Sequence, residues 1–325
     1  MNSIKIPKIE LHVHLDGSVR IATLSELSGL SLEETQLQAI ASMQCKDLND
    51  YLTKFDLATS VMQTKENLIR ISYELAEDLI EDGVVYAEVR FAPTKHQLEG
   101  LSLEEVVDSV LAGFRKSSLK VNLILCMMRD DSFEVNKKII ALAKRSYKKG
   151  VVALDLAGAE ALYKTRDFKE LFLLAKQEFI PYTIHAGEAD DWSSVFSAIE
   201  FGATRIGHGI RALENDSLID IIKQKKILLE ICPTSNIQTG IVKSISAHPI
   251  NILKKMNINV SINTDNRTVS FTNLENEYKK LANLFNYDVK EFCKFNKMAV
   301  EAAFLSQTEK NELNVLIDEY LNQFS

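Results

Sequence analysis

The first apolar run of the chain is Ile9-Glu10-Leu11-His12-Val13-His14-Leu15, which is typical of a β-strand that ends in two histidines. Because alternate residues of a strand point to the same face, the imidazoles of His12 and His14 project together from the end of this strand. Two neutral imidazoles that converge in this way suit zinc. The stretch therefore predicts a strand with a metal site at its carboxyl end.

Seven further runs of apolar and β-branched residues also predict strands. They are residues 84–91, 120–127, 151–156, 181–185, 205–208, 227–231 and 259–263. Amphipathic helical patterns lie between most of them, at residues 103–117, 135–149, 167–178, 193–201 and 213–224. Each pattern is long enough for a crossover between parallel strands. Eight strands that alternate with helices predict an α/β fold, the (β/α)₈ TIM barrel.

Two segments depart from this alternation. The segment of approximately residues 21–82, between the first two strands, predicts several helices, one of them an amphipathic helix over 65–82. An insertion at this position lies above the barrel mouth, so we expect a helical lid over the substrate. Residues 274–325 predict extra C-terminal helices that pack outside the barrel. No repeat or flexible linker interrupts the sequence, which favours a single domain over residues 1–325.

Composition narrows the class of partner. The chain has 325 residues, 46% of them hydrophobic, and a net charge of −7, which argues against nucleic acid and favours a small molecule. The first eight residues lack the apolar core of a leader, and no run approaches the ~20 apolar residues of a membrane span. We therefore expect a cytoplasmic protein without membrane association. Its four cysteines are widely spaced, which indicates reduced thiols. The oligomeric state stays open.

Other metal-capable residues close later strands. His185 ends the fifth, His208 the sixth and Asp265 the eighth, and the carboxyl ends of barrel strands meet at one mouth. Three imidazoles and a carboxylate at that mouth predict one divalent ion, with zinc favoured and water in an open position. His208 is either a further ligand or a group that orients the metal's water. A second metal would need a bridging lysine, which residues 151–158 lack.

Some candidate residues have two interpretations. Glu188, three residues after His185, is equally a general acid or a carboxylate that caps the next helix. For Asp155, in the fourth strand, we favour a structural hydrogen-bond acceptor. His96 and His248 fall outside the motifs and are predicted to be surface or loop histidines.

Taken together, several motifs resemble the adenosine deaminase family. They are Glu10-Leu11-His12-Val13-His14-Leu15-Asp16-Gly17, Asp155-Leu156-Ala157-Gly158, His185-Ala186-Gly187-Glu188, Gly207-His208-Gly209, Cys232-Pro233-Thr234-Ser235-Asn236 and Asn263-Thr264-Asp265. A lone His-x-His pair occurs in many metal-dependent hydrolases, whereas His-Ala-Gly-Glu and Gly-His-Gly at these spacings are specific. The resemblance covers nearly the whole chain.

The resemblance implies an activity and a ligand set. The activity is hydrolytic deamination of adenosine, and of 2′-deoxyadenosine, to inosine or deoxyinosine and ammonia in purine salvage. The ligands of one Zn²⁺ would be His12, His14, His185 and Asp265, and the ion makes hydroxide available near neutral pH. Asp265 would also hold this hydroxide in its attacking position.

The resemblance also implies two catalytic residues. His208 would orient the hydroxide and share in its deprotonation. Glu188 would protonate ring nitrogen N1 and so make C6 of the purine electrophilic.

The same resemblance implies how the substrate is held. Asp16 would contact a ribose hydroxyl, the Gly158 backbone would bond a ring nitrogen, and His14 belongs with the substrate-binding residues. The sequence departs from the family at Asn266, where many members have a second aspartate that bonds purine N7. An asparagine carries an amide donor at any pH, so we expect Asn266 to keep this contact, although a loop residue that only supports Asp265 is the alternative.

Other functions remain open at this stage. An adenine deaminase of the same fold would use the same chemistry on a free base, and a zinc-stabilised barrel could serve only as a binding module. A nucleotide deaminase would need a basic cluster for phosphate, and none lies near the motifs. The cytidine-type zinc deaminases are disfavoured because their H-x-E and P-C-x-x-C pattern is absent.

Overall fold

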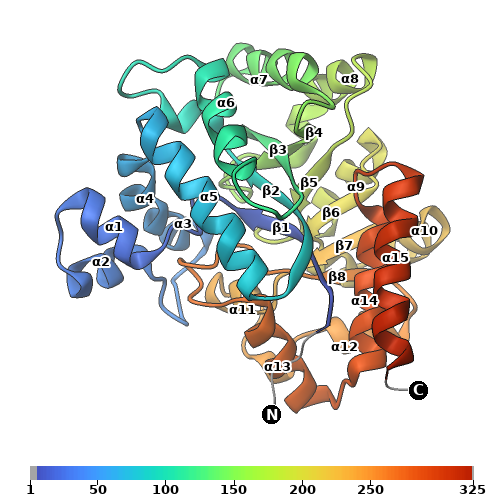
Figure 1. Ribbon diagram of the computed structural model, residues 1–325. Helices are drawn as coiled ribbons and strands as arrows, with labels where there is room; N and C mark the ends of the chain where they lie inside the picture. The colour runs from blue at the N-terminus through green and yellow to red at the C-terminus, as the bar shows by residue number, and fades with distance from the viewer. Residues whose placement is uncertain (1–5, 324–325) are drawn as a thin grey trace.

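Eight parallel strands form the centre of the computed structural model, which describes residues 6–323 (Figure 1). They are β1 (Lys8–His14), β2 (Val84–Phe91), β3 (Val121–Met128), β4 (Val151–Ala157), β5 (Thr183–Ala186), β6 (Arg205–His208), β7 (Leu228–Ile231) and β8 (Asn259–Ile262). Each lies within two residues of a strand that the sequence predicts. All seven residues of β4 are buried, as expected for a parallel strand that is covered on both faces.

The strands pair in sequence order as β1-β2-β3-β4 and β5-β6-β7-β8, and isolated bridges join the two sheets. At one seam, the Leu154 amide donates to the Pro181 carbonyl over 2.9 Å. At the other, the Asp265 amide donates to the carbonyl of His12 over 2.8 Å, and the His14 amide donates to the carbonyl of Asp265 over 2.7 Å. These seams complete the predicted (β/α)₈ barrel and place Asp265 beside the two histidines of β1.

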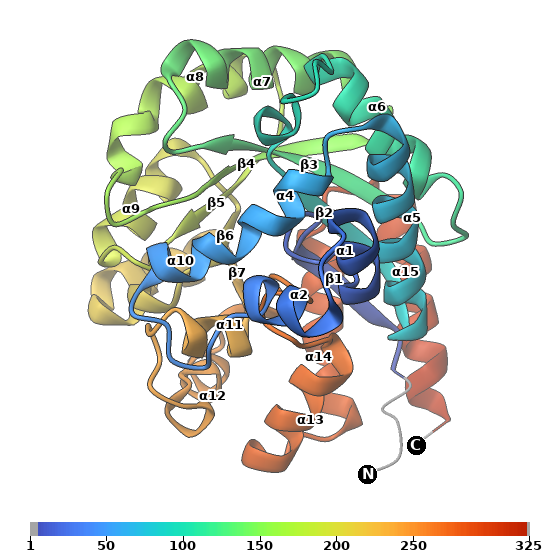
Figure 2. The same cartoon turned by 90° about the vertical axis from the view of Figure 1, so that its left-hand side faces the viewer.

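Helices cover the outside of the barrel between the strands (Figure 2). They are α6 (Leu103–Phe114), α7 (Phe133–Ser146), α8 (Lys169–Gln177), α9 (Trp192–Phe201), α10 (Asp216–Lys225) and α12 (Ile250–Lys255). The short helix α11 (Pro233–Gln238) follows β7 at the mouth, and the connections also contain the 3₁₀ turns η2 (Pro93–His96), η3 (Thr165–Phe168), η4 (Ile210–Glu214) and η5 (Ile245–Ala247). Side-chain caps fix where helices begin. The Ser132 hydroxyl, for example, accepts from the Val135 amide, so α7 starts two residues earlier than its apolar pattern predicts.

The insertion after β1 has two parts. Its first elements are α1 (Ile21–Ser28), α2 (Leu32–Ala39), α3 (Leu48–Leu52), η1 (Thr53–Phe55) and α4 (Asp56–Val61). In Figure 2 they lie across the face of the barrel that turns toward the viewer. The long helix α5 (Lys65–Glu81) instead runs along the outside against α6 and serves as the crossover to β2 (Figure 1). The part of the insertion over the mouth is therefore α1 to α4.

The C-terminal helices are α13 (Leu274–Phe285), α14 (Val289–Ala302) and α15 (Gln307–Asn322). Helix α14 packs on β8 and β1, where the side-chain oxygen of Asn296 accepts from the Ile9 amide over 3.0 Å. The expected packing of this segment outside the barrel is thus seen up to residue 323, while residues 1–5 and 324–325 of the expected domain lie outside the described part. Among the described helices, none is long and apolar enough to cross a bilayer.

Candidate metal centre and active site

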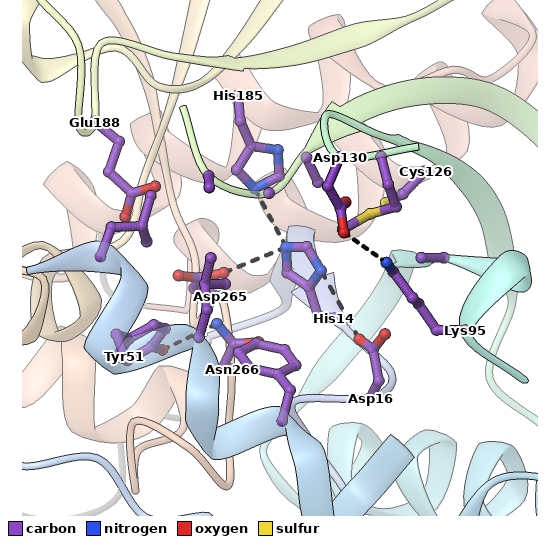
Figure 3. Close-up of a pocket in the computed structure, with 18 of the residues that line it drawn as sticks. His14, Asp16, Tyr51, Lys95, Cys126, Asp130, His185, Glu188, Asp265 and Asn266 are labelled. Carbon is purple, nitrogen blue, oxygen red and sulfur yellow. Dashed lines mark hydrogen bonds and ion pairs between the residues drawn. The ribbon is translucent and has the colours of Figure 1, made fainter. Parts of the chain in front are cut away.

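Four side chains, three of them buried and that of His14 partly exposed to the cavity, converge at the carboxyl ends of the strands. His12 and His14 come from β1, His185 from β5, and Asp265 follows β8 (Figure 3 labels the last three). One ligand atom from each of the four lies within 4.8 Å of the others. Oδ1 of Asp265 is 3.4 Å from Nε2 of His12 and equally far from Nε2 of His14. The structure therefore brings together the four predicted ligands.

The chemistry of this cluster fits a divalent cation. Nδ1 of His12 lies 2.7 Å from Glu230 Oε2, and Nδ1 of His185 lies 2.9 Å from Asp155 Oδ2. A carboxylate at Nδ1 fixes the tautomer and leaves the lone pair on Nε2. Nε2 of His185 lies only 3.2 Å from Nε2 of His14, and Nε2 of His12 is buried without a hydrogen-bond partner. Lone pairs this close, beside a carboxylate, are stabilised by a shared cation.

The backbone is unusual at this cluster. His208 and Asp265 have φ values of 60° and 61°, in the left-handed region that side chains rarely adopt. Strain of this kind collects at functional sites. A Cβ atom on Gly207 would lie 3.0 Å from Cε1 of His12 and 3.2 Å from Cα of His185. Glycine before His208 thus allows β6 to pass close to two of the predicted ligands.

Glu188 lies in the cavity beside the cluster, as Figure 3 shows, and its Oε2 is 3.5 Å from Nε2 of His208. The alternative interpretation of Glu188 as a helix cap is wrong, because Asp191 caps α9. Glu160 instead accepts hydrogen bonds from the amides of residues 187–190 and so holds this loop. Burial and the charges of Asp265 and Glu160 raise the pKa of Glu188 well above its usual value. This environment favours the protonated form of the Glu188 carboxyl.

Beneath the cluster lies a buried network of charges. Arg90 donates to Asp155 and Glu230, over 2.8 Å each, and Nε of Arg205 donates to Glu230 over 2.7 Å. Burial alone would raise the pKa of Glu230, but Arg90 and Arg205 hold that pKa well below its usual range. Asp155 is the structural acceptor that the sequence predicts. Sequence reasoning missed Arg90, Arg205 and Glu230, although a charged residue inside an apolar strand was a signal.

This network yields a testable prediction. Glu230→Gln removes the negative charge between two buried arginines, so we expect the free energy of unfolding to fall by about 3–5 kcal/mol. Because Glu230 also orients His12, zinc affinity is expected to fall about 10–100-fold. Chemical denaturation and competition with a chelator measure the two effects. The control Glu214→Gln breaks an exposed pair with Arg211 and is expected to cost at most about 1 kcal/mol; equal losses in both variants would contradict this role for Glu230.

A cavity of about 470 Å³ opens over the cluster. Its lining includes Leu48, Tyr51, Leu52, Phe55, Asp56 and Thr59 from the insertion, and Ala92, Lys95, Met128, Asp130, Leu162 and Tyr163 from loops at the mouth. Asp16, Gly158 and Asn266 line it together with His14, His185, Glu188, His208 and Asp265. The predicted metal, catalytic and substrate-binding residues thus border one cavity, apart from His12, which lies behind it.

Comparisons with known proteins agree with these observations. The model of the family described as adenosine deaminase matches residues 7–320. An adenosine deaminase from Enterococcus faecalis is 43% identical over 326 residues, with 97% of each chain covered, and one from Clostridium perfringens strain SM101 is 40% identical, with 98% of this chain and 99% of the relative covered.

The chain belongs to the adenosine deaminase family. The resemblance drawn from its motifs is confirmed. Among solved structures, the N6-methyl-AMP deaminase from Arabidopsis thaliana is similar with a TM-score of 0.86 at 27% identity, and 97% of each chain is covered. The adenine deaminase from Arthrobacter aurescens has a TM-score of 0.89 at 22% identity, covering 98% of this chain and 99% of that one, which supports the barrel fold.

The family's frequent second aspartate is Asn266 here, and its surroundings are close-packed. Its Nδ2 donates to the hydroxyl of Tyr51 over 2.9 Å, and that hydroxyl lies 2.7 Å from Ser270 Oγ. A Cβ on Gly17 would lie 1.8 Å from Oδ1 of Asn266, so the glycine is required for this approach. An amide nitrogen has two hydrogens, and one remains for a ligand. Sequence reasoning missed Tyr51, which comes from the insertion.

Two further histidines are buried, so the prediction of surface positions for His96 and His248 is wrong. His248 does lie in a loop, as the alternative allowed, whereas His96 ends the 3₁₀ turn η2. Nδ1 of His96 lies 3.1 Å from the carbonyl of Met62, and Nδ1 of His248 accepts from the Ile250 amide. Bonds to backbone groups compensate burial, and no sequence motif reveals them.

Proposed function

We propose that this enzyme hydrolyses adenosine, and 2′-deoxyadenosine, to inosine or deoxyinosine and ammonia in purine salvage. The observation that carries the proposal is the meeting, in one cavity, of a metal-capable cluster and the buried carboxyl of Glu188, whose pKa is raised. Hydrolysis at C6 of a purine needs a nucleophile made from water and an acid for a ring nitrogen. The two features supply these two groups, and family membership supports the same reaction.

We assign His12, His14, His185 and Asp265 as ligands of one Zn²⁺ per chain. Zinc in this site would supply a Lewis acid that makes water nucleophilic near neutral pH. Three nitrogens and one oxygen suit zinc, with room for an exchangeable ligand on the cavity side. The buried carboxylates Glu230 and Asp155 hold two of the imidazoles in the required tautomer.

The chain's own groups carry the remaining steps. Glu188 donates its proton to ring nitrogen N1, which draws electrons from C6. His208 orients the attacking water, whose oxygen forms the new bond to C6. The proton that the water loses passes through the carboxylate of Asp265 to the amino nitrogen. The bond from C6 to this nitrogen then breaks and ammonia leaves, while the remaining hydroxyl proton returns to Glu188. The product is the 6-oxo purine.

Four residues that line the cavity would hold the nucleoside. Asp16 accepts a hydrogen bond from a ribose hydroxyl, and His14, whose Nδ1 is 4.0 Å from Asp16 Oδ1, borders the same end of the cavity. The Gly158 backbone bonds a purine ring nitrogen. The free amide hydrogen of Asn266 points to purine N7.

The charges that line the cavity favour a nucleoside over a nucleotide. Among the lining residues Lys95 is the only lysine or arginine, and its Nζ is already paired with Asp130 Oδ2 over 2.9 Å. We expect kcat/KM for AMP to be at least about 100-fold below that for adenosine, because a phosphate would face unpaired carboxylates. Steady-state assays of ammonia release compare the two substrates. Equal values would contradict this assignment of substrate class.

An adenine deaminase is the second candidate. It is separated from the first by mixing zinc-quantified protein with adenosine or with adenine while ammonia and ultraviolet absorbance are followed. Turnover of adenosine alone supports the nucleoside and the role of Asp16, and turnover of adenine alone reverses the assignment. Turnover of neither substrate by the zinc-loaded protein would favour a binding module.

A further inference from the structure

Three hydrogen bonds connect a backbone amide to the imidazole of His208. The amide of Ile250, the first residue of α12, lies 3.2 Å from Nδ1 of His248. Nε2 of His248 lies 3.3 Å from Oδ1 of Asn236 in α11, and Nδ2 of Asn236 lies 3.0 Å from Nδ1 of His208. The three side chains are buried, with exposed fractions of 3%, 0% and 1% in this order.

The direction of each bond follows from the first. A backbone N–H can only donate, so Nδ1 of His248 carries a lone pair and its proton is on Nε2. This proton is donated to Asn236, which places the amide oxygen toward His248 and the NH₂ group toward His208. Nδ1 of His208 is therefore an acceptor. The network, rather than an arbitrary choice of amide orientation, determines this assignment.

We infer that His208 is held as the neutral tautomer with its proton on Nε2, so that it donates a hydrogen bond into the active-site cavity, and that Asn236 and His248 are positioning residues for this purpose. An imidazole whose Nδ1 accepts a hydrogen bond must hold its proton on Nε2. The inference deepens the proposed function, on which its catalytic meaning rests.

A donor at this position has a defined use. Nε2 of His208 lies 3.5 Å from Glu188 Oε2, and its ring centroid is 4.9 Å from that of His12, so it borders both the acid and the metal-capable cluster. An N–H here bonds a lone pair of the attacking water and fixes its oxygen. It has no lone pair with which to take a proton, so His208 orients the nucleophile and another group accepts its proton. This differs from the shared deprotonation that the resemblance implies.

The surroundings of His248 agree with a neutral imidazole. Burial lowers the pKa of His248 to about 4. His248 therefore needs no second proton near pH 7, as its two hydrogen bonds require.

The tautomer can be measured directly in the zinc-loaded enzyme by ¹⁵N NMR of the histidine rings through their two-bond couplings. The chain has six histidines, and His208→Gln and His248→Gln assign the two signals of interest. We expect both rings to carry the proton on Nε2. A proton on Nδ1 of His208, or an imidazolium at pH 7.5, would overturn the inference. This readout needs no substrate, so it is independent of whether adenosine is turned over.

Kinetics test the positioning role. Asn236→Leu removes the donor to His208, and we expect kcat to fall at least about tenfold with KM changed less than about twofold, because a misplaced imidazole proton acts on turnover. Gln238→Leu is the matched control: the residue is a buried amide in the same helix, but it bonds the Ala41 carbonyl and not His208. Equal losses of kcat in both variants would indicate a merely structural role.

His248→Phe is a second variant that tests the positioning of His208. It leaves Asn236 in place but removes the partner that fixes its amide orientation, so we expect both tautomers of His208 in the NMR spectrum and a loss of kcat smaller than that of Asn236→Leu. A single unchanged tautomer and wild-type kcat would show that His248 does not position His208. If the wild-type enzyme has its proton on Nε2 of His208 but does not deaminate adenosine, the proposed function fails, while the positioning of His208 by Asn236 and His248 is retained.

Discussion

Glu188→Gln is expected to lower kcat by about 10²–10⁴, the usual contribution of a general acid. Glutamine fills the same space but has no acidic proton for the purine ring. Zinc should stay bound, because Glu188 is not among the four clustered ligand candidates. The measurements are steady-state ammonia release and metal content of the purified variant.

The pH dependence of activity tests the same role of Glu188. Glu188 acts in its protonated form, and burial together with the charges of Asp265 and Glu160 raises its pKa well above the usual value. Activity should therefore be lost as pH rises through this raised pKa, and Glu188→Gln should lack that limb. Asp190→Asn, in the same loop, breaks an ion pair with Lys164 and serves as the control. A Glu188→Gln rate within threefold of wild type would remove the residue from the mechanism.

Asp265→Ala is expected to have the second large effect, loss of the metal. The side chain supplies the only carboxylate of the cluster, so zinc affinity should fall by at least about 100-fold, more than outer contacts provide. The fold should survive, because the seam between β1 and β8 uses the backbone of Asp265. Zinc content, circular dichroism and ammonia release measure these effects.

The adjacent residue offers the control. Asn266→Ala removes a group from the cavity wall that is outside the ligand cluster, so we expect normal zinc content and a raised KM. Full zinc occupancy and normal turnover in Asp265→Ala would refute the ligand set.

The strands and the meeting of the ligands could be predicted because each depends on a local pattern. A short apolar run predicts a buried strand whatever it pairs with, and β4 shows this with seven buried residues. His14 ends β1, His185 is the penultimate residue of β5 and Asp265 follows β8, so the barrel brings them together without further information. The amphipathic pattern also predicts the bounds of α5. Its place outside the barrel, however, depends on packing against α6 and not on its own pattern.

The support around the site could not be predicted for a physical reason. Glu160 holds amides 27 to 30 positions away in sequence, Glu230 contacts Arg90, 140 positions away, and Asn236 contacts His208, 28 positions away. A carboxylate or amide has the same local signature whether it faces solvent or a buried arginine. Burial away from water makes the contacts of these carboxylates and amides energetically important, and the whole fold decides which groups are buried. The buried position of His248 depends in the same way on a turn that presents the Ile250 amide.

Ammonia release from adenosine during zinc titration of the metal-stripped protein measures how the activity depends on the metal. We expect no turnover without metal, a rise in proportion to added Zn²⁺, and saturation at one ion per chain. Turnover by the metal-free protein, or a rise that continues to a second ion, would contradict this expectation.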